Sequence, residues 1–467
     1  MTNGVKRFGR TKKLHFVGIG GAGMSGIAEI LLTMGYEVTG SDMAESDTVR
    51  LLRSAGAIVA IGHSAENVSD ADVVVVSSAI KPTNPEVIQA RGSHIPVIPR
   101  AEMLAELMRM KHAVTVAGAH GKTTTTSMIA VMLAKGGYDP TIVIGGKVDR
   151  FGSGAKLGAG DILVAEADES DGSFLNLYPT IAVVTNIDAE HLDHYGSFDN
   201  VKNAFVKFIN KTPFYGVTAL CLDDPAIQEI IPKITKRFIT YGIKSSADLT
   251  AREIRYDKFT TSFTVVSAGV ELGRVSIAMP GAHNALNALA AMSVGLELGM
   301  EPSAIIAALD GFAGVQRRCQ VKGEAGGVMV VDDYGHHPNE IRATVRAIKE
   351  GFPDRRLVVV FQPHRYTRTR DLMEEFHTAF YGADELVVME VYAAGETPIE
   401  GVSGAVIAEG VIEHGKKGVR FAPDIESALQ TLAGMLKKGD IALTLGAGSV
   451  TTLGEKIIAS LSQRTEA

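Results

Sequence analysis

One short glycine-rich stretch constrains the fold of this chain more than any other feature. Residues 117–125 read Ala-Gly-Ala-His-Gly-Lys-Thr-Thr-Thr. The β-branched segment 112–116 precedes the stretch, and an uninterrupted helical pattern over 124–135 follows it. A strand, a glycine-rich turn and a helix in this order aim backbone N–H groups and a helix dipole at an anion. The stretch therefore predicts a phosphate-binding loop in an α/β nucleotide-binding domain.

The residues of this loop suggest ATP and Mg²⁺ as ligands. Lys122 would reach the β- and γ-phosphates, and the Thr123 hydroxyl would bind Mg²⁺. The strict motif G-x-x-x-x-G-K-[ST] is not met, because Val116 stands five residues before Gly121. The alternative is a surface turn that happens to contain Gly-Lys-Thr. The residues expected to bind the nucleotide are Gly118, Ala119, His120, Gly121, Lys122, Thr123 and Thr124.

Length and composition set outer bounds on the fold. The 467 residues predict two to four domains, and 46% hydrophobic residues suffice for several cores. The net charge of −7 does not indicate a nucleic-acid-binding surface. No apolar run approaches the ~20 residues of a membrane span. Cys221 and Cys319 have no metal-type spacing, which suits a reducing cytoplasm. Whether the protein is a monomer or a homodimer stays open.

A second glycine-rich turn lies near the N-terminus. A buried strand over 14–18 leads into Gly-Ile-Gly-Gly-Ala-Gly-Met-Ser-Gly at 18–26, which opens a helix. The next strand ends in Ser41 and Asp42, where a ribose-binding acid belongs. This pattern predicts a nucleotide diphosphate, either NAD or a UDP-sugar. The residues expected to bind the substrate here are Gly20, Gly21, Ala22, Gly23, Ser41 and Asp42, and, after the strand at 73–76, Ser77 and Ser78, for which capping is the alternative.

Acidic residues follow a buried strand at 162–165. Four carboxylates occur within residues 166–171, which is costly unless a cation is nearby. Mg²⁺ is the natural candidate, and we expect Glu166 to be its ligand. A solvated acidic turn is the alternative. His191 follows the next strand, 181–185, but its residue type alone favours a structural role because Mg²⁺ prefers oxygen.

The next segment differs from the parallel core before it. Residues 247–280 predict hairpin strands, an antiparallel appendage. Asn284 and Asn287 open a long helix, where they could read an adenine edge, with helix capping as the alternative. Arg317 lies beside a loop and suits phosphate oxygens, or belongs to a surface pair.

Beyond a predicted bend at 322–327, strands and helices alternate again. Segments 332–338 and 362–370 follow strands and concentrate His, Arg and Tyr. This mixture suits the binding of an amino acid, because Arg can donate two hydrogen bonds to the carboxylate and Tyr or His can orient the amine. For each arginine a surface charge is the alternative.

Taken together, these segments resemble the Mur ligase family, the ATP-dependent amide ligases that build the peptide of the bacterial cell wall. The resemblance extends over essentially the whole chain. It rests on residues 18–26, 117–125, 166–171, 186–195, 283–287, 332–338 and 364–370, all in the family order.

The resemblance implies three α/β domains. A Rossmann-like domain over 1–107 would bind UDP-N-acetylmuramate, and a central domain over 108–322, with the antiparallel appendage, would bind ATP. A second Rossmann-like domain over 323–467 would bind L-alanine. The protein would then act in peptidoglycan precursor synthesis in the cytoplasm.

The resemblance also implies residue roles. Glu166 matches a Mg²⁺ ligand, and His191 matches a histidine that serves a second Mg²⁺. The resemblance therefore favours a metal role for His191, whereas its residue type alone favours a structural role. Asn284 and Asn287 match adenine contacts. The residues that match the L-alanine region are Tyr334, His336, His364, Arg365 and Arg368. Sister enzymes carry a carbamylated lysine after the His191 segment, but neither Lys202 nor Lys207 has the required spacing, so we predict none.

The implied reaction activates a carboxylate. The γ-phosphoryl group of ATP passes to the lactyl carboxylate, and the amine of L-alanine attacks the acyl phosphate. The residues expected to be catalytic are Lys122, His191, His336 and Arg365. Three rivals remain: an NAD-dependent dehydrogenase, a phosphate-loop switch or motor, and a family member that adds another substrate.

Overall fold

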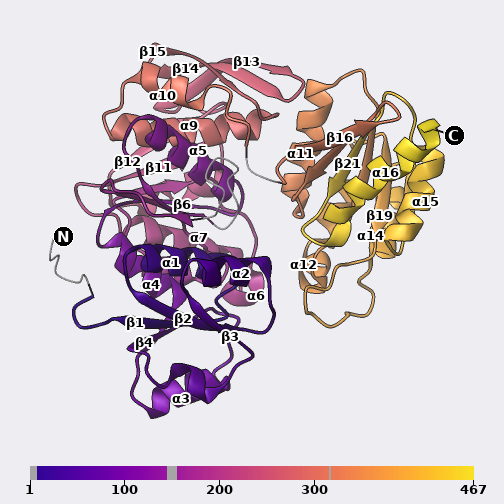
Figure 1. The fold of residues 1–467 in the computed structure, drawn as a ribbon. Coiled ribbons are helices and arrows are strands. Elements are labelled where there is room, and N and C mark those ends of the chain that lie inside the picture. Colours follow the sequence, from indigo (N-terminus) through magenta and orange to yellow (C-terminus); the bar gives the residue numbers. More distant parts are fainter. Residues whose placement is uncertain (1–7, 145–154, 315–316, 467) are drawn as a thin grey trace. The chain divides into compact units, whose positions relative to one another are not determined.

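The computed structural model describes residues 8–144, 155–314 and 317–466, and these residues form three β-sheets with flanking helices (Figure 1). By contacts the chain divides into two compact units. The first comprises Met1–Arg252, Thr264–Val275 and Leu286–Leu309, and the second Glu253–Phe263, Ser276–Ala285 and Asp310–Ala467. None of the described helices is long and apolar enough to cross a membrane.

The N-terminal sheet is parallel, with strand order β3-β2-β1-β4-β5. Its strands are β1 (Lys13–Val17), β2 (Glu37–Asp42), β3 (Ile58–Ile61), β4 (Val73–Val76) and β5 (Val97–Pro99). Its helices are α1 (Ala22–Thr33), α2 (Asp47–Ser54), η1 (Ala65–Val68), α3 (Pro85–Gly92) and α4 (Arg100–Met108). The strand order reverses between β1 and β4, and the carboxyl ends of strands at such a point form ligand crevices. The glycine-rich turn after β1 lies there.

The central sheet has the order β15-β14-β13-β12-β11-β10-β6-β9-β7-β8. Its strands are β6 (His112–Ala117), β7 (Thr141–Val143), β8 (Ala155–Lys156), β9 (Ile162–Glu166), β10 (Ile181–Val184), β11 (Val217–Cys221), β12 (Phe238–Gly242), β13 (Leu249–Asp257), β14 (Thr260–Ser267) and β15 (Val270–Ile277). Its helices are α5 (Lys122–Lys135), η2 (Ser173–Asn176), α6 (Leu192–Tyr195), α7 (Phe198–Ile209), α8 (Pro225–Ile230), η3 (Ile231–Lys233), α9 (Ala282–Glu297) and α10 (Pro302–Leu309). Strand β6 lies between β9 and β10 and is parallel to both, so the loops after these three strands meet at one edge.

Strands β13, β14 and β15 form the predicted appendage. Two-residue turns join them, and Ala268 and Gly269 in the second turn both have positive φ, 47° and 86°. Such turns connect antiparallel hairpin strands.

The C-terminal sheet has the order β16-β17-β21-β18-β19-β20, and only the edge strand β16 is antiparallel to its neighbour. Its strands are β16 (Gln320–Ala325), β17 (Val328–Asp333), β18 (Leu357–Phe361), β19 (Glu385–Met389), β20 (Val419–Ala422) and β21 (Ile441–Leu445). Its helices are α11 (Pro338–Gly351), α12 (Tyr366–Asp371), α13 (Met373–Thr378), α14 (Gly404–Glu413), α15 (Ile425–Met435), η4 (Ser449–Thr452) and α16 (Leu453–Glu466). The bend predicted at 322–327 is wrong, because most of it is β16, which pairs with β17 through a turn at Gly326 and Gly327.

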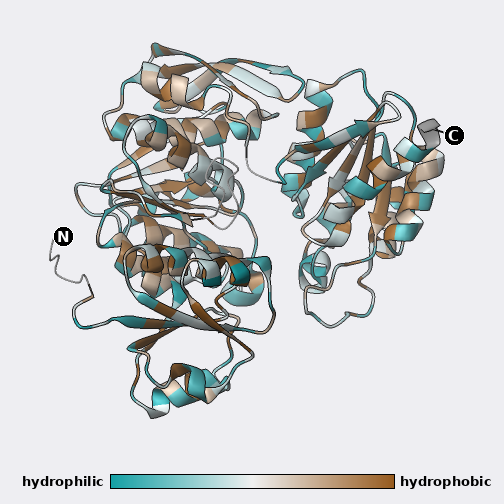
Figure 2. Ribbon diagram, in the orientation of Figure 1, coloured by the Kyte–Doolittle hydropathy of each residue, from teal (hydrophilic) through white to brown (hydrophobic). Residues whose placement is uncertain are grey.

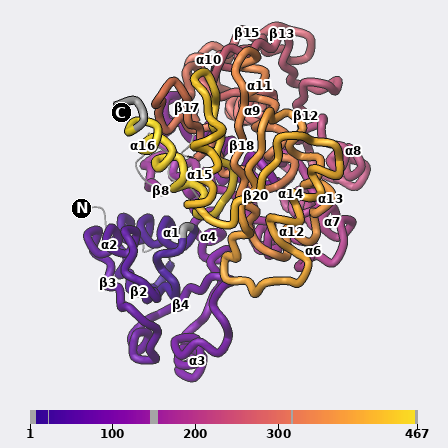
Figure 3. The backbone as a smooth tube through the Cα atoms, turned by 90° about the vertical axis from the view of Figure 1, so that its right-hand side faces the viewer, coloured from indigo at the N-terminus to yellow at the C-terminus, as the bar shows by residue number. Residues whose placement is uncertain are grey.

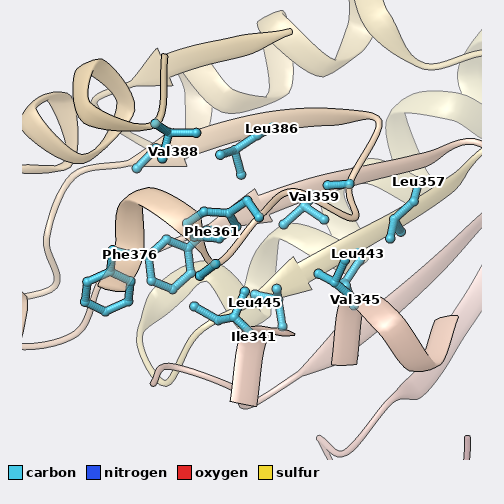
Figure 4. Packing of buried hydrophobic residues seen from close by; sticks show 14 of the residues in the cluster. Ile341, Val345, Leu357, Val359, Phe361, Phe376, Leu386, Val388, Leu443 and Leu445 are labelled. Atoms are coloured by element: carbon cyan, nitrogen blue, oxygen red, sulfur yellow. The ribbon is translucent and has the colours of Figure 1, made fainter. Parts of the chain in front are cut away.

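Successive side chains of the C-terminal strands point to opposite faces of the sheet, so each face has its own hydrophobic core. Val359, Phe361 and Leu443 face α11, α13 and α14, as Figure 4 shows for part of the cluster. Val358, Val360 and Ala442 face α15 and α16 on the other side. Figure 2 shows the same pattern, with hydrophobic strands between helices that carry hydrophilic outer faces. The α/β class predicted from the sequence is confirmed.

Candidate active site

The phosphate loop joins β6 directly to α5 and has the predicted strand-turn-helix geometry. Gly118 and Gly121 have φ of 132° and 83°, and Gly121 is the N-cap of α5. A Cβ on Gly118 would lie 2.1 Å from Thr185 Oγ1, and one on Gly121 would lie 2.7 Å from Asn287 Oδ1. Both positions therefore require glycine, for conformation and for space.

The segment after β10 supports this loop from one side. Asn186 Oδ1 accepts a hydrogen bond from the His120 backbone N–H at 2.8 Å, and Asn186 Nδ2 donates to the His120 carbonyl oxygen at 2.9 Å. Thr185 Oγ1 donates to the same oxygen at 2.6 Å, and His120 Nε2 lies 3.0 Å from Asp188 Oδ2. Side chains about 65 residues further along the chain thus fix the loop backbone.

Lys122 lies folded over its own loop. Its Nζ donates to Gly118 O at 2.5 Å, to Ala119 O at 3.2 Å and to Glu169 Oε1 at 2.8 Å. Burial would lower the pKa of Lys122, but the carboxylates around it, Glu169 first and then Glu190 and Asp168, together raise that pKa. Burial in turn raises the pKa of Glu169 despite the lysine. The ammonium is therefore charged at neutral pH and positioned at the start of α5.

Acidic groups surround the same edge of the sheet. Glu166 ends β9 opposite Val116 of β6, one residue before the loop begins. One ligand atom each from Glu169, Glu190 and His191 lies within 4.8 Å of the others. His191 has a left-handed backbone, φ 57°, which stores strain in a non-glycine residue. The metal roles of Thr123, Glu166 and His191 stay predictions, and this geometry adds Glu169 and Glu190 to the acidic surroundings.

The two predicted adenine contacts begin α9. Asn287 lies against the phosphate loop, where its Oδ1 accepts a hydrogen bond from Thr125 Oγ1 at 3.1 Å. Thr124, beside Thr125, is buried. Asn284 is buried, and its Nδ2 donates to Pro280 O at 2.8 Å. Asn287 thus supports the loop itself, and adenine recognition stays a prediction for both.

The N-terminal glycine-rich turn is held by an acid and covered by an arginine. Asp42 Oδ2 accepts a hydrogen bond from Gly20 N–H at 2.8 Å, and Gly21 is the N-cap of α1, which begins at Ala22. A Cβ on Gly23 would lie 2.6 Å from Nη1 of Arg100, so the guanidinium lies directly over the turn. Arg100 also reaches Asp168 Oδ2 at 3.4 Å. A cation at a helix N-terminus is well placed for a diphosphate.

The predicted serines differ in their surroundings. Ser41 is fully buried and donates to Glu86 Oε2 at 2.7 Å, with His63 Nδ1 2.9 Å away. Its side chain is thus part of a buried network, and nothing in its surroundings supports a ligand contact. Ser77 follows β4 and is half-buried, whereas Ser78 is exposed. Burial would raise the pKa of Asp171, but hydrogen bonds from Ser173 and, after it, from Ser78 lower that pKa.

In the second unit, the C-terminal sheet brings four aromatic rings together. Tyr334 and His336 follow β17, with ring centroids 5.3 Å apart, and His336 and His364 are 5.9 Å apart. His364 stacks on Tyr392 at 5.6 Å. Arg368 Nη1 donates to His364 O at 3.3 Å. The segments after β17 and β18, which the sequence placed at strand ends, thus meet.

Two predicted arginines have backbone φ values that side chains rarely adopt. Arg317 has φ 61° and Arg365 has φ 72°. The Arg317 guanidinium donates to Gly446 O at 2.7 Å and lies over the Tyr334 ring at 4.8 Å. The Arg365 backbone N–H donates to Tyr392 O at 2.9 Å. Strain of this kind persists where the surrounding structure fixes it, often at functional sites.

Burial keeps both histidines of this group neutral. It lowers the pKa of His336 to about 3, although Glu340 opposes the shift, and burial with Arg368 lowers the pKa of His364 to about 4. His336 Nδ1 lies 3.1 Å from Tyr334 O, so it donates there, and Nε2 remains an acceptor. At neutral pH His336 therefore accepts a hydrogen bond but is a weak base.

The buried neutral His336 predicts a loss of stability in acid. The unfolded chain protonates this histidine below about pH 6.5, whereas the folded chain does so only near a pKa of about 3. The free energy of unfolding should therefore fall between these values, by about 2 kcal/mol at about pH 5. We expect His336→Gln to reduce the drop in Tm between neutral pH and pH ~5. An equal drop in both proteins would contradict the neutral assignment.

Comparison with known proteins decides the family. The description "Mur ligase family, catalytic domain" matches residues 13–112, "Mur ligase middle domain" matches 116–295, and "Mur ligase, glutamate ligase domain" matches 317–448. The chain belongs to the Mur ligase family. Its three-domain α/β fold is that of the family, as the sequence predicted.

Curated relatives match over nearly the full length. UDP-N-acetylmuramate–L-alanine ligase from Pelobacter propionicus is 57% identical over 457 residues, 98% of this chain and 99% of that protein. The enzyme of the same name from Trichlorobacter lovleyi is 58% identical over 455 residues, 97% of this chain and 100% of that protein. The solved UDP-N-acetylmuramate–alanine ligase of Thermotoga maritima superposes with a TM-score of 0.81 at 29% identity, covering 97% of this chain and 100% of that chain.

Sequence reasoning missed several residues at these sites. Glu169 was one of four neighbouring carboxylates, and only the fold shows that it pairs with Lys122. Tyr195 donates to Glu169 O at 2.5 Å, and Arg100 lies over Gly23. Arg100 had a sequence signal, because a cation directly follows a strand end in a nucleotide-type domain.

Proposed function

We propose that this chain joins L-alanine to the lactyl carboxylate of UDP-N-acetylmuramate with ATP. The reaction passes through an acyl phosphate and yields ADP and phosphate, in peptidoglycan precursor synthesis. The supporting observation is the 57–58% identity to enzymes of that name over nearly the whole chain. In this proposal residues 1–107 bind the UDP-sugar, 108–322 bind ATP and 323–467 bind L-alanine.

Phosphoryl transfer needs positioning and neutralisation of charge. Lys122, held at the start of α5, is placed to bind the phosphate oxygens in place of the loop carbonyls that it now contacts. The N–H groups of Gly121 to Thr124, at the start of α5, would face the same anion. Thr123, Glu166 and His191 would hold Mg²⁺, and the ion would neutralise phosphate charge. The carboxylates of Glu169 and Glu190 beside His191 make this surrounding suitable for the cation.

Amide formation needs a neutral amine and a fixed carboxylate. In this proposal Arg365 and Arg368 bind the carboxylate of L-alanine, which the position of Arg368 beside His364 supports. His336, neutral with a pKa of about 3, would orient the amine by accepting a hydrogen bond at Nε2. His336 is too weak a base to hold a proton, so water or the departing phosphate would take the proton that the amine loses.

Arg100 is expected to bind the diphosphate of the UDP-sugar. Removing one charge-assisted hydrogen bond costs about 1.5–3 kcal/mol, so Arg100→Gln should raise the KM for UDP-N-acetylmuramate by about 10–100-fold. The KM for ATP should hardly change. Arg109→Gln is the matched control, since the exposed Arg109 follows the same helix, where it pairs with Glu106 and lies 6.0 Å from the Tyr178 ring centroid. Equal sugar KM values for Arg100→Gln and wild type would contradict the assignment.

Phosphate release tests the function directly. ATP, Mg²⁺ and UDP-N-acetylmuramate would be offered with each single L-amino acid. Release that requires both the sugar and L-alanine supports the proposal, and release with another amino acid would keep the family but change the step. Release that needs neither would favour a phosphate-loop switch.

A cytoplasmic location fits this reaction, because ATP and nucleotide-sugar precursors are cytoplasmic substrates. Fractionation of cells that express the chain would test it. Sedimentation equilibrium would distinguish the monomer from the homodimer that the sequence leaves open.

A further inference from the structure

Two histidines and a glutamate meet on the face of the C-terminal sheet that α11, α13 and α14 cover, in elements that the proposed reaction does not use. Glu374 and His377 belong to α13, and His414 is the C-cap of α14. The two helices pack against each other and appear side by side in Figure 3. One ligand atom from each of the three side chains lies within 4.8 Å of the other two.

His377 is buried without hydrogen-bond partners. Its exposed fraction is 8%, and among the described residues neither Nδ1 nor Nε2 has a partner. The nearest carboxylate oxygen, Glu374 Oε2, is 3.7 Å from Nδ1, beyond hydrogen-bond distance. A buried polar ring with no partner is unfavourable, so a ligand that binds its nitrogen would remove a cost.

The neighbouring helix is shaped around this ring. A Cβ on Gly410 would lie 2.1 Å from His377 Nε2, so α14 can approach only with glycine at that position. Glycine inside a helix costs about 0.5–1 kcal/mol relative to alanine. The edge of the ring that bears Nδ1 faces Glu374, and the opposite edge rests on Gly410.

His414 is already oriented as a ligand. Its Nδ1 lies 2.8 Å from Gly410 O and donates to it, which leaves Nε2 with a free lone pair. Tyr381 donates its hydroxyl to His414 O at 3.0 Å, which fixes the backbone there. A ring N–H bonded to a backbone carbonyl is the usual support of a metal-binding histidine.

We propose that Glu374, His377 and His414 bind a divalent transition-metal ion of the Zn²⁺ type. Two imidazole nitrogens and one carboxylate oxygen suit Zn²⁺, Co²⁺ or Ni²⁺ rather than Mg²⁺ or Ca²⁺, which prefer oxygen alone. Water would complete the tetrahedron. Ligand atoms around Zn²⁺ lie roughly 3.4 Å apart for bonds of ~2.1 Å, so the site must contract slightly. Glu374, with an 82% exposed side chain, and the exposed His414 are free of the packing that would prevent it.

The bound ion would link α13 to α14. Both helices cover the same core of the C-terminal sheet, through Phe376 on α13 and Ile407 and Val411 on α14. An ion held by both helices would stabilise the folded chain by mass action. The site is therefore a structural or regulatory metal site separate from the Mg²⁺ site of the proposed reaction.

Calorimetric titration of the untagged full chain with Zn²⁺, in excess Mg²⁺ and ADP, tests the proposal. We expect a single Zn²⁺ site, and weakening of its Kd by more than about tenfold in Glu374→Gln and in His414→Ala. Both positions are on the surface, so both variants should fold. His94→Ala, which removes an exposed histidine of the N-terminal sheet region, is the matched control and should bind Zn²⁺ as wild type does.

Thermal unfolding gives a second readout. Zn²⁺ should raise the Tm of wild type and of His94→Ala but not that of His414→Ala. Wild-type Zn²⁺ affinity in His414→Ala and Glu374→Gln would overturn the proposal and assign the ion to the central-domain carboxylates. Absence of Zn²⁺ binding to wild type would overturn it as well, and neither result would affect the ligase assay.

Discussion

Replacement of Lys122 by methionine is expected to lower kcat/KM for ligation by on the order of 10³-fold or more. The side chain keeps its length but loses the ammonium that lies at the start of α5. In the proposed reaction that charge neutralises phosphate oxygens while the γ-phosphoryl group is transferred. Lys122→Arg should not restore activity, because the planar guanidinium cannot replace a compact ammonium in a loop this tight.

The same substitution also disturbs folding, which has to be separated from catalysis. Without Lys122, the buried Glu169 loses the partner 2.8 Å away. Removal of one member of a buried ion pair typically costs about 3–5 kcal/mol. The double variant Lys122→Met/Glu169→Gln removes both charges and should recover most of that stability. Its ligation rate should stay as low as that of the single variant.

Phosphate release and thermal unfolding, measured on the same preparations, provide the two readouts. Lys244→Met, a change of an exposed lysine, is the control for loss of a positive charge and should match wild type in both. If the double variant regains both stability and turnover, Lys122 acts only by neutralising Glu169. Near-wild-type turnover in Lys122→Met would remove the lysine from the mechanism altogether.

The local patterns around the phosphate loop were predictable from the sequence because they depend on neighbouring residues. The apolar segment before Gly118 and the helical pattern after Gly121 gave β6 and α5 within a few residues. The meeting of the 332–338 and 362–370 segments also followed from the sequence, because the carboxyl ends of parallel strands share an edge.

Partners far apart in the sequence could not be predicted. Lys122 and Glu169 are 47 residues apart, and four carboxylates were available to pair with the lysine. Ser41 looked like a ligand contact because it ends a strand, yet its hydroxyl turns into the buried Glu86 network. The neutral state of His336 likewise depends on burial, which residue type does not reveal. At 322–327 the glycines suggested a bend, whereas only Gly326 and Gly327 form the turn.

Substitution of Gly118 by alanine is expected to disable the phosphate loop. The new Cβ would lie 2.1 Å from Thr185 Oγ1. The backbone of the alanine would also have to adopt a φ of 132°. Backbone strain of about 1–3 kcal/mol adds to about 1–3 kcal/mol of overpacking, so the folded chain should lose about 2–6 kcal/mol. Because Thr185 donates to the His120 carbonyl, any shift also moves the loop N–H groups that we propose to face the phosphates.

Gly137→Ala separates the two causes. Gly137, just after α5, has a φ of 83° but nothing within 4 Å of a Cβ, so it reports the conformational cost alone, about 1 kcal/mol. The readout is the rise in Tm on addition of ADP and Mg²⁺. Wild type and Gly137→Ala should show the rise and Gly118→Ala should lose it, because only Gly118 contacts the support of the loop. A full ADP-induced rise in Gly118→Ala would mean that the nucleotide does not bind at this loop.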